Sequence, residues 1–230
     1  MIMAPETLDG TLAPVRHVLL DFDGPVCSVF AGFSAGDVAQ SLVALLRGPD
    51  GPPPGHEESD PLAMLRRIAE TREDLVSAAD SHLTQLEVEA VGRARPTPGG
   101  VPFMEACAAT GRSVWVVSNN ATAAIDRYLS DHGLRDLVAG TFGRTAGRPE
   151  SMKPSPELLI AAMRAADAKP GECVFIGDAV RDVEAAHAAD MKTIGYANKP
   201  GKADALSAAG AVAVVTSMET LAASVTWHQR

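Results

Sequence analysis

The chain has 230 residues, of which 46% are hydrophobic and 21% are charged. This composition is typical of a folded protein and too apolar for a disordered one, and the length allows a core with a smaller inserted domain. Asp and Glu outnumber Lys and Arg by 29 to 20, a net charge of −9 that argues against a nucleic-acid partner, because no basic surplus exists to displace counterions.

Three further features concern the cellular compartment. No apolar run reaches the roughly 20 residues that span a bilayer, so we expect no membrane partner. The first 14 residues lack the basic and apolar regions of a secretory signal. Cys27, Cys107 and Cys173 are scattered, without the paired spacing of a zinc site or a disulfide framework. We therefore expect a cytoplasmic protein.

In chain order, residues 1–14 are expected to form a loose tail, because they contain Pro5, Gly10 and Pro14. Short apolar runs then predict strands at 15–20, 114–117, 173–176, 193–196 and 212–215, with a weaker strand at 138–142. Near-continuous apolar strands are typical of a parallel sheet that is buried on both faces. Helical patterns separate the strands, so the sequence predicts a doubly wound α/β core.

Two of the helices between strands have recognisable ends. After Asn120, the spacing of Ile125 and Leu129 predicts a helix that ends at Gly133. Ser155 is expected to cap a second helix whose first residue is Pro156.

Residues 27–97 interrupt the alternation, because they contain helical patterns and no convincing strand. The helical patterns cover 34–46, 61–71 and 72–91, and the Gly- and Pro-rich stretch 48–55 is expected to be a loop. We therefore predict three parts, which are a tail with the first core strand (1–26), a small inserted helical domain (27–97) and the remainder of the α/β core (98–230).

Four groups of polar residues lie where predicted strands end and loops begin. They are Asp21-Phe22-Asp23-Gly24, Ser118-Asn119-Asn120, Lys153, and the segment from Gly177 to Asp182 that contains Asp178. Taken singly, each has an ordinary interpretation as a turn, a helix N-cap or a solvated charge. In open α/β sheets, however, ligands bind at the carboxyl ends of the strands. The four groups together are therefore the candidate site.

The ordered set resembles the four motifs of the haloacid dehalogenase superfamily of hydrolases. The segment from Asp21 to Val26 is similar to the first motif, Ser118 to the second, Lys153 to the third, and Asp178 with Asp182 to the fourth. The resemblance extends from residue 15 to about residue 200, and the insertion at 27–97 is similar to the helical cap of subfamily I, as in phosphoglycolate phosphatases. It implies a Rossmann-like core and phosphoryl-transfer chemistry.

The resemblance also implies catalytic roles. Asp21 would attack phosphorus and form an aspartyl-phosphate, and Asp23 would protonate the leaving alcohol and later accept a proton from the attacking water. Ser118, the backbone amide of Asn119 and Lys153 would hold the phosphate oxygens.

For the metal, the resemblance implies Mg²⁺, because attack of one anion on another requires positive charge at the site. The ligands would be Asp21, the backbone carbonyl of Asp23 and Asp178, since Mg²⁺ prefers oxygen ligands. Asp182 would hold a metal-bound water or orient Lys153.

Asp23 separates the activities known in this superfamily. Dehalogenases lack this second aspartate, and residues 27–97 contain no lysine for the Schiff base of a phosphonoacetaldehyde hydrolase. We therefore predict a Mg²⁺-dependent phosphatase that acts on a small phosphorylated metabolite. The alternatives are a phosphomutase of the β-phosphoglucomutase type and a catalytically degenerate binding protein. The sequence indicates no oligomeric state.

The first motif departs from the family pattern at two positions. Pro25 stands where Thr is usual, which removes a hydroxyl and a backbone donor that would position Asp23. Ser28 stands where an acidic residue is often found.

Overall fold

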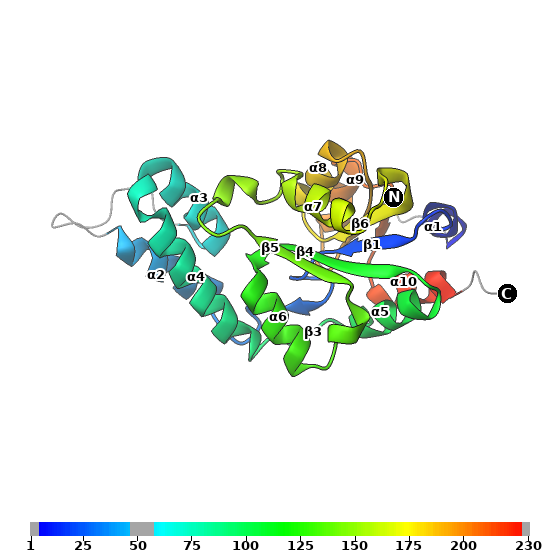
Figure 1. The fold of residues 1–230 in the computed structure, drawn as a ribbon, viewed down its shortest axis with the longest axis horizontal. Coiled ribbons are helices and arrows are strands. Elements are labelled where there is room, and N and C mark those ends of the chain that lie inside the picture. Colours follow the sequence, from blue (N-terminus) through cyan, green and yellow to red (C-terminus); the bar gives the residue numbers. More distant parts are fainter. Residues whose placement is uncertain (1–4, 47–57, 227–230) are drawn as a thin grey trace.

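The computed structural model describes residues 5–46 and 58–226, so the loop expected at 48–55 lies outside the described residues. A six-stranded sheet in the order β5-β4-β1-β6-β7-β8 forms the centre of the chain (Figure 1). The strands are β1 (His17–Leu20), β4 (Ser113–Ala121), β5 (Gly140–Arg144), β6 (Cys173–Gly177), β7 (Lys192–Tyr196) and β8 (Ala213–Val215). All of their pairings are parallel, which confirms the predicted doubly wound α/β fold.

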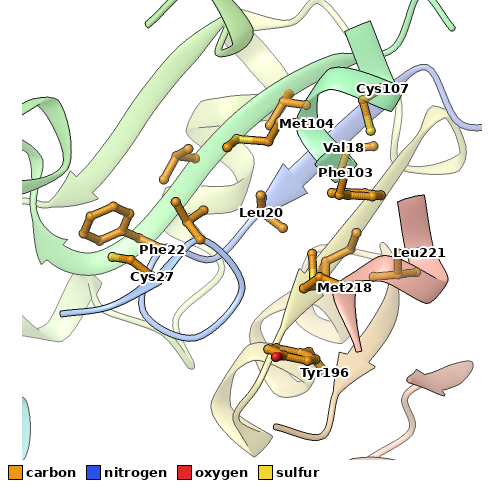
Figure 2. Close-up of a cluster of buried hydrophobic side chains, with 14 of the residues drawn as sticks. Val18, Leu20, Phe22, Cys27, Phe103, Met104, Cys107, Tyr196, Met218 and Leu221 are labelled. Atoms are coloured by element: carbon orange, nitrogen blue, oxygen red, sulfur yellow. The ribbon is translucent and has the colours of Figure 1, made fainter. Parts of the chain in front are cut away.

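Helices cover both faces of the sheet, which explains why the central strands β1 and β6 are apolar at nearly every position. One face carries α1 (Pro5–Leu12), α5 (Gly100–Ala109), α6 (Thr122–Asp131) and α10 (Met218–Thr226), and the other carries α7 (Glu157–Ala165), α8 (Val180–Ala188) and α9 (Lys202–Ala208) (Figure 1). Val18 and Leu20 of β1 belong to the core on the first face, and Leu19 belongs to the core on the second. Figure 2 shows the first core, where Phe103 of α5 lies beside Val18 and where Leu221 and Met218 of α10 lie near each other.

The order of the strands fixes where a site can form. β1 is paired with β4 on one side and with β6 on the other, so the chain reverses its direction of strand addition at β1. Polar segments that follow β1 and β6, and the end of β4, therefore meet at one edge of the sheet.

The helices α2 (Ala35–Leu45), α3 (Pro61–Thr71) and α4 (Val76–Val91) lie together at one end of the molecule (Figure 1). They share a separate hydrophobic cluster, which includes Val38, Leu65 and Leu83. Ser34 caps α2 by accepting a hydrogen bond from the Asp37 amide, and Asp60 caps α3 by accepting one from the Leu62 amide. The same cluster contains Met152, which brings these helices against the loop that carries Lys153.

The prediction of a loose tail at residues 1–14 is wrong for α1. Leu8 and Leu12 are buried in the same core as Leu221 and Val225 of α10, because a spacing of four residues places both leucines on one helix face. Residues 1–4 lie outside the described part of the chain.

The prediction that residues 27–97 contain no strand is also wrong. Two-residue strands, β2 (Cys27–Ser28) and β3 (Arg95–Pro96), pair antiparallel where the helical segment leaves and rejoins the rest of the chain. The helix predicted over 72–91 is divided into the 3₁₀-helix η1 (Glu73–Leu75) and α4.

The remaining differences are local. Helix α7 begins at Glu157 with Pro156 as its N-cap residue, and the Ser155 hydroxyl accepts a weak hydrogen bond from the Glu157 amide at 3.4 Å. Short 3₁₀-helices complete the described chain at η2 (Arg135–Leu137), η3 (Pro149–Ser151) and η4 (Pro170–Glu172). All three cysteines are buried and free. Within the described residues, no helix has the length and apolar character needed to cross a membrane.

Candidate active site

The first motif follows directly from the end of β1. The Asp21 amide donates to the Ile176 carbonyl at 2.8 Å, which continues the β1–β6 pairing and leaves the Asp21 side chain at the sheet edge. Asp23 is more open to solvent, and its Oδ1 accepts a hydrogen bond from the Val29 amide at 3.0 Å. Pro25 has no backbone N–H and cannot donate a hydrogen bond to Asp23, so the Val29 amide supplies the backbone donor instead.

Lys153 lies at the centre of the candidate site. Its side chain is 1% exposed, and its Nζ lies 2.9 Å from Asp21 Oδ1 and 2.7 Å from Asp182 Oδ1. Burial alone lowers the pKa of Lys153, but Asp182 and Asp21 outweigh this and raise the pKa above its ordinary value. Lys153 is therefore a buried, charged ammonium between two carboxylates.

Asn119 holds the backbone of Lys153 through both atoms of its side-chain amide. Asn119 Oδ1 accepts from the Lys153 amide at 2.8 Å, and Asn119 Nδ2 donates to the Lys153 carbonyl at 3.1 Å. Arg66 of α3 donates to the same carbonyl at 2.6 Å. The sequence singled out the backbone amide of Asn119 but not this side-chain role, which depends on the approach of the loop that carries Lys153 to the end of β4.

Asp21, Asp178 and Asp182 form a cluster of carboxylates. Each offers one oxygen, and these oxygens all lie within 4.8 Å of one another. Two glycines make room for them, because a Cβ at Gly24 would lie 2.7 Å from Asp178 Cγ and one at Gly177 would lie 2.5 Å from Asp182 Oδ2. A hard donor set of this kind fits Mg²⁺. This cluster and the predicted ligand set share Asp21 and Asp178. They differ in the third member, which is the Asp182 side chain in the cluster and the Asp23 backbone carbonyl in the prediction.

Asp178 is the third corner of this cluster, and it has its own polar partners. Its Oδ2 accepts from Asn198 Nδ2 at 2.8 Å and forms an ion pair with Lys202 Nζ. Neither partner was singled out from the sequence, because both come from the segment after β7, which carries no recognisable pattern.

Burial of its carboxylates dominates the electrostatics of the site. Burial raises the pKa of Asp21 from 3.8 to about 7, with Asp182 and Asp178 adding to the rise and Lys153 opposing it. Desolvation also raises the pKa of Asp23, against the hydrogen bond from the Val29 amide, which lowers it. A bound cation would relieve the part of these shifts that comes from repulsion between the carboxylates.

The predicted site residues surround one small cavity of about 40 Å³. It is lined by Asp21, Asp23, Leu62, Ser118, Asn119, Asn120, Lys153, Asp178 and Arg181. Asp182 lies behind this lining, where it is fully buried against Lys153. Leu62 and Arg181 were not predicted as site residues, although Arg181 lies between Asp178 and Asp182 in the sequence.

A larger recess of about 430 Å³ shares Asp23 and Asp178 with this cavity. Phe30, Ala31 and Ala35 give it an apolar side, and Arg95 and Lys199 line it as cations. The arrangement thus has a small polar compartment and an adjoining larger compartment whose lining is partly apolar and partly cationic.

A polar site at the point where the strand order reverses is the usual ligand position in a doubly wound α/β protein. The sequence model of the haloacid dehalogenase-like hydrolases matches residues 15–190. The chain therefore belongs to the haloacid dehalogenase-like hydrolase family, as the four motifs indicated.

Solved structures resemble the chain over most of its length. A predicted phosphatase from Clostridium acetobutylicum is 19% identical with a TM-score of 0.72, over 92% of this chain and 98% of the other. CbbY from Rhodobacter sphaeroides in complex with phosphate is 17% identical with a TM-score of 0.67, over 89% and 95%. At these identities the likeness shows the shared fold.

A curated relative is similar over a shorter stretch. The protein SUPPRESSOR OF QUENCHING 1, chloroplastic, from Arabidopsis thaliana is 33% identical over 97 residues. The match covers 42% of this chain and 9% of that protein's length.

Proposed function

We propose that the protein is a Mg²⁺-dependent phosphomonoesterase that acts on a small phosphorylated metabolite. The observation that supports this proposal is the position of Lys153, whose ammonium lies 2.9 Å from Asp21 at the wall of a small polar cavity. That arrangement combines a carboxylate able to attack phosphorus with a buried cation able to hold a phosphate oxygen.

Mg²⁺ would be held by the side chains of Asp21 and Asp178 and by the backbone carbonyl of Asp23, with Asp182 behind them. When bound, the ion supplies positive charge to the phosphate and to the carboxylates that repel one another. The fit rests on Asp21 and Asp178, whose side-chain oxygens lie within 4.8 Å of each other and of an Asp182 oxygen.

In the first half of the reaction, an Asp21 oxygen bonds to phosphorus while the bond from phosphorus to the leaving oxygen breaks. Asp23 gives its proton to the leaving oxygen, a role that its raised pKa favours. Lys153, the Ser118 hydroxyl and the Asn119 amide hold the remaining phosphate oxygens.

In the second half, Asp23 takes a proton from a water molecule, and the resulting hydroxide attacks phosphorus. The bond between phosphorus and Asp21 breaks, which releases phosphate and restores both aspartates to their starting states.

We further propose that residues 27–97 act as a cap on a core made of 1–26 and 98–230. Leu62 of α3 lines the small cavity, so this helix lies over the phosphate position. The leaving group would occupy the larger recess, between the apolar side with Phe30 and the cations Arg95 and Lys199.

The first experiment measures phosphate release from p-nitrophenyl phosphate and from a panel of phosphorylated metabolites, with and without Mg²⁺. We expect metal-dependent turnover that falls below detection in Asp21→Asn. Asp190→Asn is the matched control, because it makes the same chemical change at an exposed residue. Absence of metal-dependent turnover across the panel would favour a degenerate binding protein, and an isomerised product without net phosphate release would favour a mutase.

The second experiment tests the role of Asp23. Asp23→Asn should lower the rate on alkyl phosphates by roughly 10²–10⁴-fold, the usual contribution of general acid–base catalysis. p-Nitrophenol leaves without a proton, so this variant should release a burst of it before hydrolysis of the aspartyl-phosphate limits the rate. Equal losses in burst and steady state on both kinds of substrate would contradict the assignment.

A further inference from the structure

A buried ion cluster lies behind the phosphate site, outside the residues used in the proposed reaction. Arg144 ends β5 with its side chain 1% exposed, and it forms ion pairs with Asp80 and with Glu87 at 2.9 Å. Both carboxylates belong to α4, and their side chains are 6% and 0% exposed. Arg144 therefore joins the helical segment to the sheet where solvent screening is weak.

The guanidinium of Arg144 also reaches the segment that holds phosphate. Its Nη1 donates to the Asn119 carbonyl at 2.8 Å, and the Asn119 side chain in turn binds the Lys153 backbone at 2.8 and 3.1 Å. Lys153 Nζ then pairs with Asp21. A continuous chain of polar contacts thus runs from α4 through Arg144 and Asn119 to the proposed nucleophile.

Glu87 fixes the same segment from the other side. It accepts from the Asn120 side chain at 3.1 Å and from the Ala121 amide at 2.9 Å. Ala121 is the N-cap residue of α6 and has no side-chain oxygen of its own. Glu87 performs for α6 what the glutamate of a capping box does within one helix, but it does so from α4.

We propose that Arg144 is a positioning residue for the phosphate site, which it serves by holding the Asn119 carbonyl and by tying α4 to residues 118–121. The inference rests on the proposed function, because only a phosphatase function gives residues 118–121 a phosphate group to hold. Arg144 touches no reacting atom, so its effect passes through Asn119 and Lys153. Displacement of a catalytic group by about 1 Å can cost on the order of 10²-fold in rate.

A merely structural role for the cluster makes a different prediction. A buried ion cluster can often be replaced by neutral residues of similar size without loss of stability. If stability were its only function, neutral replacement would restore both the fold and the activity. If Arg144 positions Asn119, neutral replacement restores the fold alone.

The test is a triple variant, Arg144→Met with Asp80→Asn and Glu87→Gln. The new amides keep an oxygen for the Gly147 and Ala121 amides, which Asp80 and Glu87 now hold at 2.9 Å. The variant therefore removes the donor to Asn119 without leaving a buried unpaired charge. Glu87→Gln also takes the acceptor from the Asn120 side chain, so Glu87→Gln alone is measured beside the triple variant and should keep most of the kcat that the triple variant loses. The matched control is Glu89→Gln with Arg93→Met, which neutralises an exposed ion pair on and just after the same helix.

We expect the triple variant to keep a melting temperature close to that of the wild type but to lose roughly 10- to 100-fold in kcat, with KM changed less than about threefold. Amide hydrogen exchange across residues 118–122 should become at least about tenfold faster, while β6 exchanges as before. The control should change none of these values.

If the triple variant folds and its kcat is unchanged, the proposal is overturned. Unchanged amide hydrogen exchange across residues 118–122 would overturn it as well. If the triple variant does not fold, Arg144→Lys replaces it, because one ammonium cannot reproduce the five hydrogen bonds of this guanidinium. If the wild type shows no turnover, the proposed phosphatase function fails, and the exchange readout alone then decides whether Arg144 orders the segment.

Discussion

Replacement of Lys153 by methionine tests the charge balance of the site. The side chains of Lys153 and Asp182 are 1% and 0% exposed, so Lys153→Met removes a buried cation and leaves its carboxylate partners without one. Loss of one partner of a buried ion pair costs about 3–5 kcal/mol. For a chain of this size, each kcal/mol lowers the melting temperature by roughly 2–4 °C, so we expect a fall of about 6–20 °C in EDTA at pH 8.

The cause of this loss is unpaired negative charge, so two treatments should reduce it. Mg²⁺ should reduce it, because the ion would bind the carboxylates that Lys153 no longer neutralises. Lowering the pH to 5 should also reduce it, because the pKa of Asp21 is raised to about 7 by burial and its carboxyl is then mostly neutral.

The assay is thermal unfolding followed by circular dichroism, in EDTA or in Mg²⁺, at pH 5 and pH 8. Lys192→Met is the matched control, because Lys192 is an exposed lysine at the start of β7. A fall of less than about 2 °C in EDTA at pH 8 would refute the reasoning from burial. A large fall that is the same under all four conditions would refute the reasoning from charge, since lost packing alone would then explain it.

Three further predictions follow from single residues. Asp21→Asn should melt at a higher temperature than the wild type in EDTA at pH 8, because burial raises the pKa of Asp21 from 3.8 to about 7 and its ionisation therefore destabilises the fold. The difference in melting temperature should shrink as the pH falls toward 4. A lower melting temperature for Asp21→Asn at pH 8 would contradict this reasoning. Gly24→Ala should abolish stabilisation by Mg²⁺ in the same assay, because its Cβ would lie 2.7 Å from Asp178 Cγ, whereas Gly210→Ala, at a similar positive φ in open space, should keep it. Leu12→Ala should cost about 2–5 kcal/mol in urea unfolding, and a change near zero would restore the view of residues 1–14 as a loose tail.

The sheet and its site edge were predictable because their signals are local. The central strands β1 and β6 are short runs of apolar residues, and three of the four motifs lie at or just after a strand end, whereas Lys153 lies in the loop between β5 and α7. A parallel arrangement places the carboxyl ends of all these strands at one edge of the sheet, and the strand order of the structure then makes β4 and β6 the neighbours of β1. Asp21, Ser118 and Asp178 could thus be placed at one edge from the sequence alone.

Elements whose stability comes from distant residues could not be predicted in the same way. Helix α1 has eight residues and contains Gly10, so it is too short to be stable alone, and it depends on packing against α10 at the other end of the chain. Strands β2 and β3 have two residues each, which is too few to show any periodicity.

The ion cluster of Arg144 was missed for a related reason. Asp80 and Glu87 are seven residues apart, which places them on one face of a helix, but a charged face ordinarily points to solvent. Only the approach of α4 to the ends of β4 and β5 buries them and supplies the partner. Charged residues that interrupt an otherwise apolar helix face are the signal that could have suggested a buried ion pair.

The distribution of charge in the site connects phosphate binding to cation binding. Lys153 is shared between Asp21 and Asp182, and Lys202 is engaged with Asp178, so these cations are already committed to carboxylates. Burial raises the pKa of Asp21, Asp182 and Asp178 raise it further, and Lys153 lowers it. A phosphate group entering a cavity of about 40 Å³ beside these carboxylates adds further negative charge where water cannot screen it. Under the proposed function, affinity for inorganic phosphate must therefore rise with Mg²⁺ concentration, and affinity for Mg²⁺ must rise with phosphate by the same factor, because the coupling between two ligands is reciprocal.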